Sequence, residues 1–277
     1  MSGRVHLRSL PADVEGLWLP AEEPFYLAVG REVELFEAAH RRQLAVMLKG
    51  PTGVGKTRFV EYMAWKLGRP LVTTTGHDDL SATDLTGRWL IRGGETVWQD
   101  GPLALAARHE AICYIDEVVE ARQDLVVVLH PLTDHRRLLP IDKRGEIVRA
   151  GPGFQLVVSY NPGYQHALKE LKPSTRQRFV TIDFGYPPPE VERTIVVREA
   201  GVDHGTAAAL VRLAGRMRVL GARGISEVPG TRLLVDAARL MAEGVAPAEA
   251  CSAAIIGPLT DDAETAAGLA DLVRLAL

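Results

Sequence analysis

Residues 50–57 read Gly50-Pro51-Thr52-Gly53-Val54-Gly55-Lys56-Thr57, the pattern G-x-x-x-x-G-K-[ST] of a phosphate-binding loop. The apolar run 44–48 before it is typical of a strand buried on both faces. After it, apolar residues recur at helical spacing from Phe59 to Leu67, and Gly68 is suited to end that helix. In such a loop, backbone N–H groups and the helix N-terminus bind phosphate oxygens. Lys56 would reach the β- and γ-phosphates and Thr57 would bind Mg²⁺, so we predict an ATP and Mg²⁺ site.

The composition is that of an ordinary globular protein. The chain has 277 residues, of which 47% are hydrophobic and 24% charged, and this length predicts about two domains. Its formal net charge of −3 argues against nucleic acid as the main partner. Cys113 and Cys251 are too few for a disulfide scaffold or a cysteine-rich metal site. Because we see neither an apolar run of about 20 residues nor a signal peptide, we expect a cytoplasmic protein without a membrane span.

The middle of the chain alternates between strand and helix patterns. After the phosphate loop we predict strands at 71–75, 111–115, 154–160 and 179–184, which with 44–48 make a five-stranded parallel sheet. Two segments interrupt this alternation and read as β-hairpins. One is 88–99, with arms on either side of Gly93-Gly94 and with Trp89 opposite Trp98; the other is 136–149.

The strand patterns end at Pro187-Pro188-Pro189, which stiffen the chain. All later segments read as helices, at about 190–200, 206–220, 231–243, 247–255 and 262–277. We therefore predict an irregular N-terminal arm at 1–28, an α/β ATPase domain at 29–188 and an all-α lid domain at 189–277.

Two acidic residues follow the predicted strand 111–115. Asp116, at the carboxyl end of a parallel strand, can hold Mg²⁺ through water opposite Thr57. Glu117 can polarise a water for attack on the γ-phosphate. An Asp-Glu pair can also be a solvated loop, but its place after a buried strand favours the catalytic interpretation.

Asn161 ends the strand 154–160, where its amide can orient the attacking water and detect the γ-phosphate. The alternative is a simple Asn-Pro turn.

Three arginines are candidates for charge stabilisation at the phosphates. Arg176 and Arg178 precede the last strand, where either guanidinium could act on the nucleotide of a neighbouring subunit. Arg232 begins a helix, where a cation is unfavourable unless an anion lies nearby, so we expect it to face the phosphates. The alternative for each arginine is an ordinary surface position.

These motifs, in this order, resemble those of the AAA+ ATPases, and the two hairpins resemble the inserts of the MoxR branch. Four longer runs resemble the CbbQ/NorQ/NirQ proteins over about residues 24 to 275: KGPTGVGKTRFVE (49–61), YIDEVVEARQD (114–124), HPLTDHRR (130–137) and SYNPGYQ (159–165). MoxR relatives usually keep one arginine directly before the phenylalanine, which is Arg178 here, while Arg176 leaves the choice open.

The resemblance implies a hexameric ring with ATP between subunits and an adaptor carrying a von Willebrand A domain, CbbO for CbbQ or NorD for NorQ. It implies a client as well, either Rubisco blocked by sugar phosphates or nitric oxide reductase. Segments 77–79 and 92–98 resemble the NorQ proteins, yet we expect the CbbQ activity.

A nucleotide-dependent assembly switch resembling GvpN, with little turnover, is a third hypothesis. A DNA translocase is disfavoured by the acidic charge and by the lack of a recognisable DNA-binding module.

Overall fold

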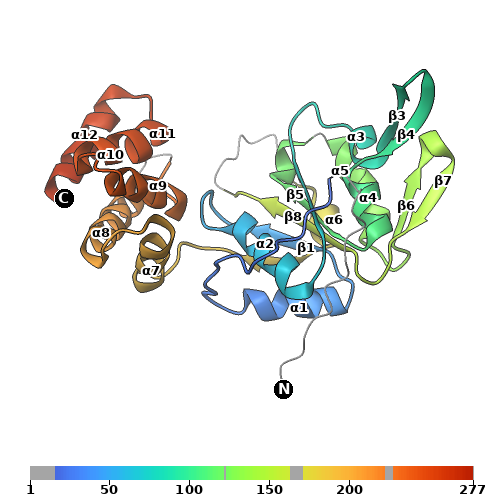
Figure 1. The fold of residues 1–277 in the computed structure, drawn as a ribbon, viewed down its shortest axis with the longest axis horizontal. Coiled ribbons are helices and arrows are strands. Elements are labelled where there is room, and N and C mark those ends of the chain that lie inside the picture. The colour runs from blue at the N-terminus through green and yellow to red at the C-terminus, as the bar shows by residue number, and fades with distance from the viewer. Residues whose placement is uncertain (1–15, 122, 163–170, 222–226, 277) are drawn as a thin grey trace. The chain divides into compact units, whose positions relative to one another are not determined.

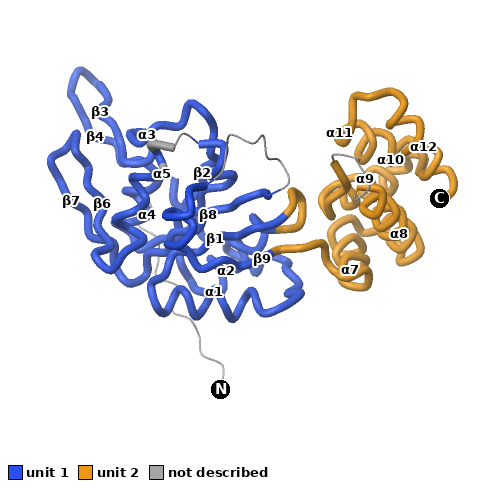
Figure 2. Tube along the Cα trace, turned by 180° about the vertical axis from the view of Figure 1, so that it is seen from behind, with its two compact units in different colours: residues 1–50, 56–183 blue, residues 51–55, 184–277 orange. Residues whose placement is uncertain are grey.

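The structure is a computed structural model that describes residues 16–121, 123–162, 171–221 and 227–276. The chain divides into two compact units (Figure 2). The first contains Met1–Gly50 and Lys56–Asp183, and the second contains Pro51–Gly55 and Phe184–Leu277. The predicted division into arm, ATPase domain and lid stays a prediction.

The first unit is built on the five-stranded parallel sheet expected from the sequence (Figure 1). Its strands lie in the order β2-β5-β8-β1-β9. All six residues of β8 are buried, so this strand is covered on both faces. The strands are β1 (Val46–Lys49), β2 (Leu71–Thr75), β5 (Ile112–Asp116), β8 (Gln155–Tyr160) and β9 (Val180–Asp183).

Strand β1 begins two residues later than the apolar run predicted. Gln43 has a left-handed backbone with φ of 57°, and Leu44 is 48% exposed, so the chain is still turning there.

The carboxyl ends of the strands meet at one edge of the sheet. Thr75 is paired with Asp116 across β2 and β5, and Lys49 is paired with Tyr160 across β1 and β8. Since the chain leaves β1, β5 and β8 at this edge, the residues that follow these strands are brought together.

The helices of the first unit lie before and between its strands along the chain, in line with the alternating patterns of the sequence. The sequence predicts a helix at 124–132, but α5 ends at Leu129, and a 3₁₀ turn (His130–Leu132) follows, since Pro131 has no N–H to continue an α-helix. Gly68 ends α2 with a positive φ, as expected. The helices are α1 (Glu32–Arg41), α2 (Lys56–Leu67), α3 (Ala82–Thr86), α4 (Pro102–His109), α5 (Gln123–Leu129) and α6 (Pro173–Arg176).

Both predicted hairpins are confirmed as separate two-stranded sheets. The first is β3 (Gly87–Arg92) with β4 (Glu95–Asp100), and the second is β6 (Leu138–Ile141) with β7 (Glu146–Arg149). Trp89 is paired with Trp98, and their rings meet edge to face at 5.2 Å. Trp89 Nε1 also donates to Lys143 O at 3.2 Å, which joins the two hairpins.

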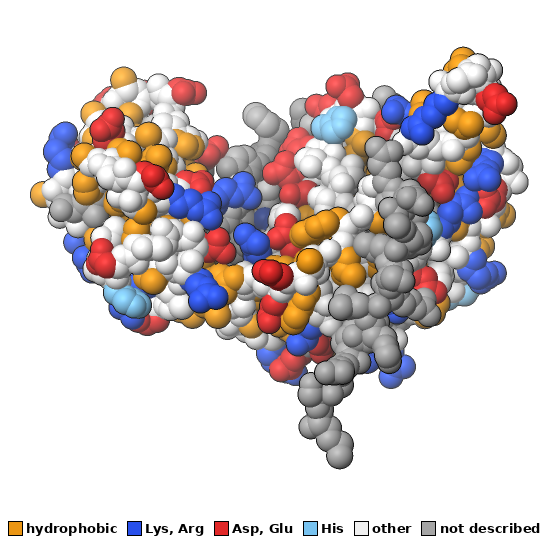
Figure 3. Space-filling model, in the orientation of Figure 1, with side chains coloured by type: hydrophobic (Ala, Val, Ile, Leu, Met, Phe, Trp, Pro, Cys, Tyr) orange, Lys and Arg blue, Asp and Glu red, His pale blue; other side chains and the backbone are white. Residues whose placement is uncertain are grey.

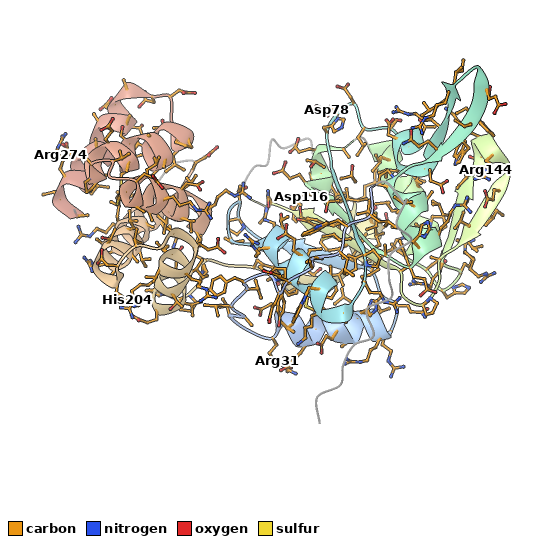
Figure 4. All side chains as sticks on the ribbon, in the orientation of Figure 1. Arg31, Asp78, Asp116, Arg144, His204 and Arg274 are labelled. Atoms are coloured by element: carbon orange, nitrogen blue, oxygen red, sulfur yellow. The ribbon has the colours of Figure 1, made fainter. Side chains whose placement is uncertain are left out.

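The hairpins expose apolar side chains among charged ones (Figure 3). Ile91 is 81% exposed and Ile147 is 66% exposed. Arg144, which Figure 4 labels on the second hairpin, lies over the Trp98 ring at 5.9 Å from its centre.

The described part of the predicted N-terminal arm, from residue 16, contacts the sheet and α2. Trp18 and Leu71 exchange two backbone hydrogen bonds, which pairs the arm with the edge strand β2. Tyr26 stacks on Tyr62 at 5.4 Å and donates to Glu32 Oε1 at 2.8 Å.

The second unit is helical from Pro189 onward and has its own apolar core, which confirms the predicted all-α C-terminal part. Residues 252–256 widen into a π-helical turn just before Pro258, whose missing N–H removes a regular helix donor. The helices are α7 (Pro189–Ala200), α8 (His204–Gly221), α9 (Thr231–Ala242), α10 (Pro247–Cys251), α11 (Gly257–Leu259) and α12 (Ala263–Ala276). Within the described residues, no helix is both long and apolar enough to span a bilayer.

Candidate active site

The predicted phosphate loop lies between the end of β1 at Lys49 and the start of α2 at Lys56. Gly53 and Gly55 have φ of +75° and +96°, a backbone region that other residues rarely adopt. These glycines let the loop curl tightly before the helix. The loop therefore has the strand-loop-helix setting in which N–H groups bind an anion.

Lys56 is buried, with 7% of its surface exposed, and lies among oxygen acceptors. Its Nζ donates to Gly50 O at 2.8 Å and to Asn161 Oδ1 at 2.5 Å. The structure thus brings together two residues that the sequence had assigned separately, one to phosphate binding and one to detection of the γ-phosphate.

Thr57 and Asp116 lie opposite each other, with Thr57 Oγ1 and Asp116 Oδ2 3.5 Å apart. Figure 4 labels Asp116 at the end of β5. A hydroxyl and a carboxylate are oxygen ligands of the kind Mg²⁺ prefers, and the metal usually keeps several waters. The pair therefore fits a Mg²⁺ ion held directly by Thr57 and through water by Asp116.

Two residues of this site were missed from the sequence, Tyr114 and Ser159. The Tyr114 hydroxyl donates to Asp116 Oδ1 at 2.7 Å and lies 3.5 Å from Thr57 Oγ1. The Ser159 hydroxyl donates to the same Asp116 oxygen and accepts from the Glu117 N–H at 2.7 Å. Burial, followed by the nearby Asp116 charge, raises the pKa of Tyr114 above its ordinary value, so Tyr114 stays a neutral donor.

A sequence signal for both residues exists. Each is a residue with a hydroxyl group inside a buried strand, two positions before a site residue: Tyr114 before Asp116 and Ser159 before Asn161. Because side chains of a strand alternate between faces, residues two apart point to the same side.

Glu117 has an unusual backbone, with φ of +53° in the left-handed region. Gly76 makes room for it, since a Cβ at Gly76 would lie 2.4 Å from Glu117 O. Asn161 Nδ2 lies 3.5 Å from Glu117 Oε1, so the Asn161 amide lies between Lys56 and Glu117. Left-handed residues outside glycine are enriched at functional sites, where surrounding contacts hold them in place.

Arg176 and Arg178 are not part of this cluster. Both side chains are exposed, and among the described residues neither forms an ion pair or a side-chain hydrogen bond. Arg178 lies close enough to His130 that, after the larger effect of burial, its charge lowers the pKa of that imidazole. The choice between the two arginines stays open.

Arg232 is the second residue of α9 and has an exposed side chain. Within the second unit, its N–H donates to Gly53 O at 3.3 Å, and a Cβ on Gly53 would lie 3.5 Å from Arg232 Cβ. This contact ties the start of α9 to loop residue 53. No group of three or more His, Cys, Asp or Glu in the described ranges is arranged to hold a metal ion.

The sheet order, the loop after β1 and the acidic pair at the end of β5 define the class of protein, an AAA-type P-loop ATPase. The family model of the AAA domain (dynein-related subfamily) matches residues 45–179, and the model of the CbbQ/NirQ/NorQ C-terminal region matches residues 192–276. The chain belongs to the CbbQ/NirQ/NorQ family of AAA ATPases, a class of proteins that in general bind and hydrolyse ATP.

The chain is similar to two relatives to nearly the same degree. It is 59% identical over 250 residues to Protein CbbQ of Hydrogenophilus thermoluteolus, covering 90% of this chain and 94% of that protein. It is 60% identical over 251 residues to Protein NorQ of Paracoccus denitrificans (strain Pd 1222), covering 91% of this chain and 93% of that protein. A crystal structure from Cytophaga hutchinsonii ATCC 33406 shares the fold, with a TM-score of 0.50, 15% identity and 90% coverage of each chain.

Proposed function

We propose that this chain is an ATP-driven remodelling enzyme that acts with a von Willebrand A-domain adaptor to reactivate inhibited Rubisco. The observation that supports the enzymatic part is the linked set Lys56, Asn161 and Glu117. It joins a phosphate-binding cation to a general base through one amide. A chain that only held nucleotide would need the cation but not the base.

In this proposal, the loop N–H groups and Lys56 bind the β- and γ-phosphates. Phosphate oxygens compete with Asn161 Oδ1 for the Lys56 ammonium, so binding of ATP releases the amide to orient a water. Glu117 polarises this water for attack on the γ-phosphate. Thr57 and Asp116 would hold Mg²⁺, which neutralises charge on the phosphate oxygens.

The proposed working form is a hexameric ring in which Arg178 acts on a neighbour's nucleotide. The exposure of Arg178 and Arg176 and their lack of ion pairs in the described residues support this part. Changes of contact at the γ-phosphate would bias the lid between two states, and hairpins 87–100 and 138–149 or the adaptor would pass that motion to the client.

The Rubisco assignment depends on the resemblance to CbbQ. The alternative client is nitric oxide reductase, and the nearly equal identities to CbbQ and NorQ support the two clients to the same degree. The assembly-switch alternative differs in kinetics, because it predicts one turnover per complex and not sustained hydrolysis.

Replacing Glu117 by Gln tests the enzymatic part. We expect hydrolysis to fall by about 10²- to 10⁴-fold, the usual contribution of a general base, with ATP affinity kept. Glu61→Gln, on the surface of α2 in an ion pair with Arg58, is the matched control and should hydrolyse ATP normally. Steady-state phosphate release and equilibrium ATP binding are the measurements, and wild-type turnover by Glu117→Gln would overturn the assignment.

The same variant tests the client. Affinity capture of Glu117→Gln from the native host with ATP present should recover Rubisco subunits together with a von Willebrand A-domain protein. Recovery of nitric oxide reductase subunits would transfer the proposal to the NorQ activity, with the mechanism unchanged. Sustained hydrolysis stimulated by adaptor and client would exclude the assembly switch.

A further inference from the structure

The first turn of α9, which carries Arg232, is held by a buried ion pair and not by its own N-cap. The N-cap residue is Gly230, which has no side chain to cap the helix. The next residue, Thr231, is buried, and its hydroxyl donates to Glu192 Oε1 on α7 at 2.7 Å.

Glu192 is 1% exposed, and both of its carboxylate oxygens accept hydrogen bonds. Arg218, on α8, donates to both of its carboxylate oxygens at 2.7 and 2.8 Å, in the two-pronged geometry that only arginine provides. Arg218 also donates from Nε to Pro229 O at 2.9 Å, just before α9, and its guanidinium lies over the Tyr186 ring at 3.9 Å.

We call the cluster of Glu192, Arg218 and Thr231 the α9 anchor. It joins α7, α8 and α9 at the point where α9 starts. Thr52 and Gly53 of the phosphate loop, which belong to the same unit, contact the start of α9 directly. The Arg232 N–H donates to Gly53 O, and a Cβ on Gly230 would lie 2.6 Å from Thr52 O. A small displacement of the α9 start would alter both the loop backbone and the direction of Arg232.

We infer that the α9 anchor is a positioning device for nucleotide recognition: it fixes Arg232, and so sets how strongly ATP is preferred over ADP. The inference rests on the proposed role of Arg232 at the phosphates. Glu192, Arg218 and Thr231 act through Arg232 and do not touch the nucleotide themselves.

The test measures ATP and ADP affinities of the full chain in the Glu117→Gln background, which prevents hydrolysis during the measurement. Thr231→Val removes the hydroxyl and keeps the shape of the side chain. We expect the ratio of ATP to ADP affinity to fall by about threefold to tenfold, the effect of one hydrogen bond. Thr231→Ser should restore the ratio, and Thr194→Val, on the exposed face of α7, should leave it unchanged.

A double-mutant comparison separates positioning from general stability. In an Arg232→Ala background, Thr231→Val should not lower the ratio of ATP to ADP affinity any further, because its effect passes through Arg232. Additive losses, or an equal weakening of ATP and ADP by Thr231→Val, would overturn the inference. A normal ratio of ATP to ADP affinity in Arg232→Ala would also overturn the inference.

Arg218→Lys provides a second route if Thr231→Val fails to fold. Lysine keeps the charge beside Glu192 but loses the two-pronged contact, so the ratio should again fall. Hydrolysis by the wild-type chain, compared with Lys56→Ala, reports on the proposed function separately. If the wild-type chain hydrolyses ATP and both anchor variants keep a normal ratio, only the positioning role is wrong. If the wild-type chain neither binds nor hydrolyses ATP, both are wrong.

Discussion

The Asp116 side of the site and the segment that carries Arg176 and Arg178 are organised in opposite ways. Asp116 accepts hydrogen bonds from Tyr114 and Ser159 and lies opposite Thr57, all from within one unit. The two arginines are exposed and, within the described residues, have no ion pair or side-chain hydrogen bond.

The difference indicates which parts of catalysis one chain can carry alone. A carboxylate held by fixed donors needs little reorganisation when the metal and phosphates arrive, which is how preorganised sites lower a barrier. An exposed arginine with no ion pair in its own described residues is free to act on a group that a second chain presents. We therefore expect one chain to bind nucleotide by itself and to hydrolyse it slowly until a second copy supplies the arginine.

The largest expected effect is at Arg178. Arg178→Ala should lower kcat for ATP hydrolysis by about 10³-fold or more, the usual contribution of an arginine finger, with ATP affinity nearly unchanged. Arg176→Ala, two residues away in the same exposed segment, is the matched comparison, and we expect a smaller loss there. A larger loss at Arg176 would reverse the assignment.

Mixing variants tests whether the arginine acts between chains. Lys56→Ala chains have no working phosphate site but keep Arg178, so adding them to Arg178→Ala chains should restore part of the hydrolysis. Activity no greater than the sum of the two separate variants would mean that Arg178 acts within its own chain.

An intermediate effect is expected at Ser159. Ser159→Ala removes the hydroxyl that accepts from the part-buried Glu117 N–H and that donates to Asp116. We expect kcat to fall by about tenfold to a hundredfold, in line with the cost of one unsatisfied buried group. Ser174→Ala, at an exposed position of α6, is the control for loss of a serine hydroxyl. An unchanged kcat in Ser159→Ala would show that Asp116 and Glu117 need no support from this residue.

The smallest effect is expected at Tyr114. Tyr114→Phe removes the donor 2.7 Å from Asp116 Oδ1 but keeps the buried ring. The Mg²⁺ concentration for half-maximal hydrolysis should change by about threefold, the effect of one hydrogen bond. Tyr62→Phe, at the stacked ring on α2, should leave this concentration unchanged. Equal Mg²⁺ dependence in both variants would show that the Tyr114 hydroxyl does not contribute to Mg²⁺ binding.

The sequence predicted the sheet and the order of the motifs because both depend on local patterns. Strands β1, β5 and β8 end at Lys49, Asp116 and Tyr160, and parallel strands bring such ends to one edge of the sheet. The sequence could not predict the strand order or the left-handed Glu117, since these depend on contacts between distant segments such as Gly76 with Glu117.

Tyr114 and Ser159 were missed for a related reason. Inside a buried strand, a single tyrosine or serine is compatible with simple packing, and only the neighbouring strand shows what its hydroxyl contacts. The roles of Arg178, Arg176 and Arg232 stay predictions, because a guanidinium acts on a group that another chain or a nucleotide must supply.

The indole pair on the first hairpin has an optical consequence. Trp89 and Trp98 lie edge to face at 5.2 Å, close enough for their electronic transitions to couple. Coupled indoles give a pair of circular dichroism bands of opposite sign, which vanishes when the rings separate. The chain therefore carries an intrinsic spectroscopic reporter of whether hairpin β3–β4 stays closed, and this signal can be followed through the ATPase cycle without a label.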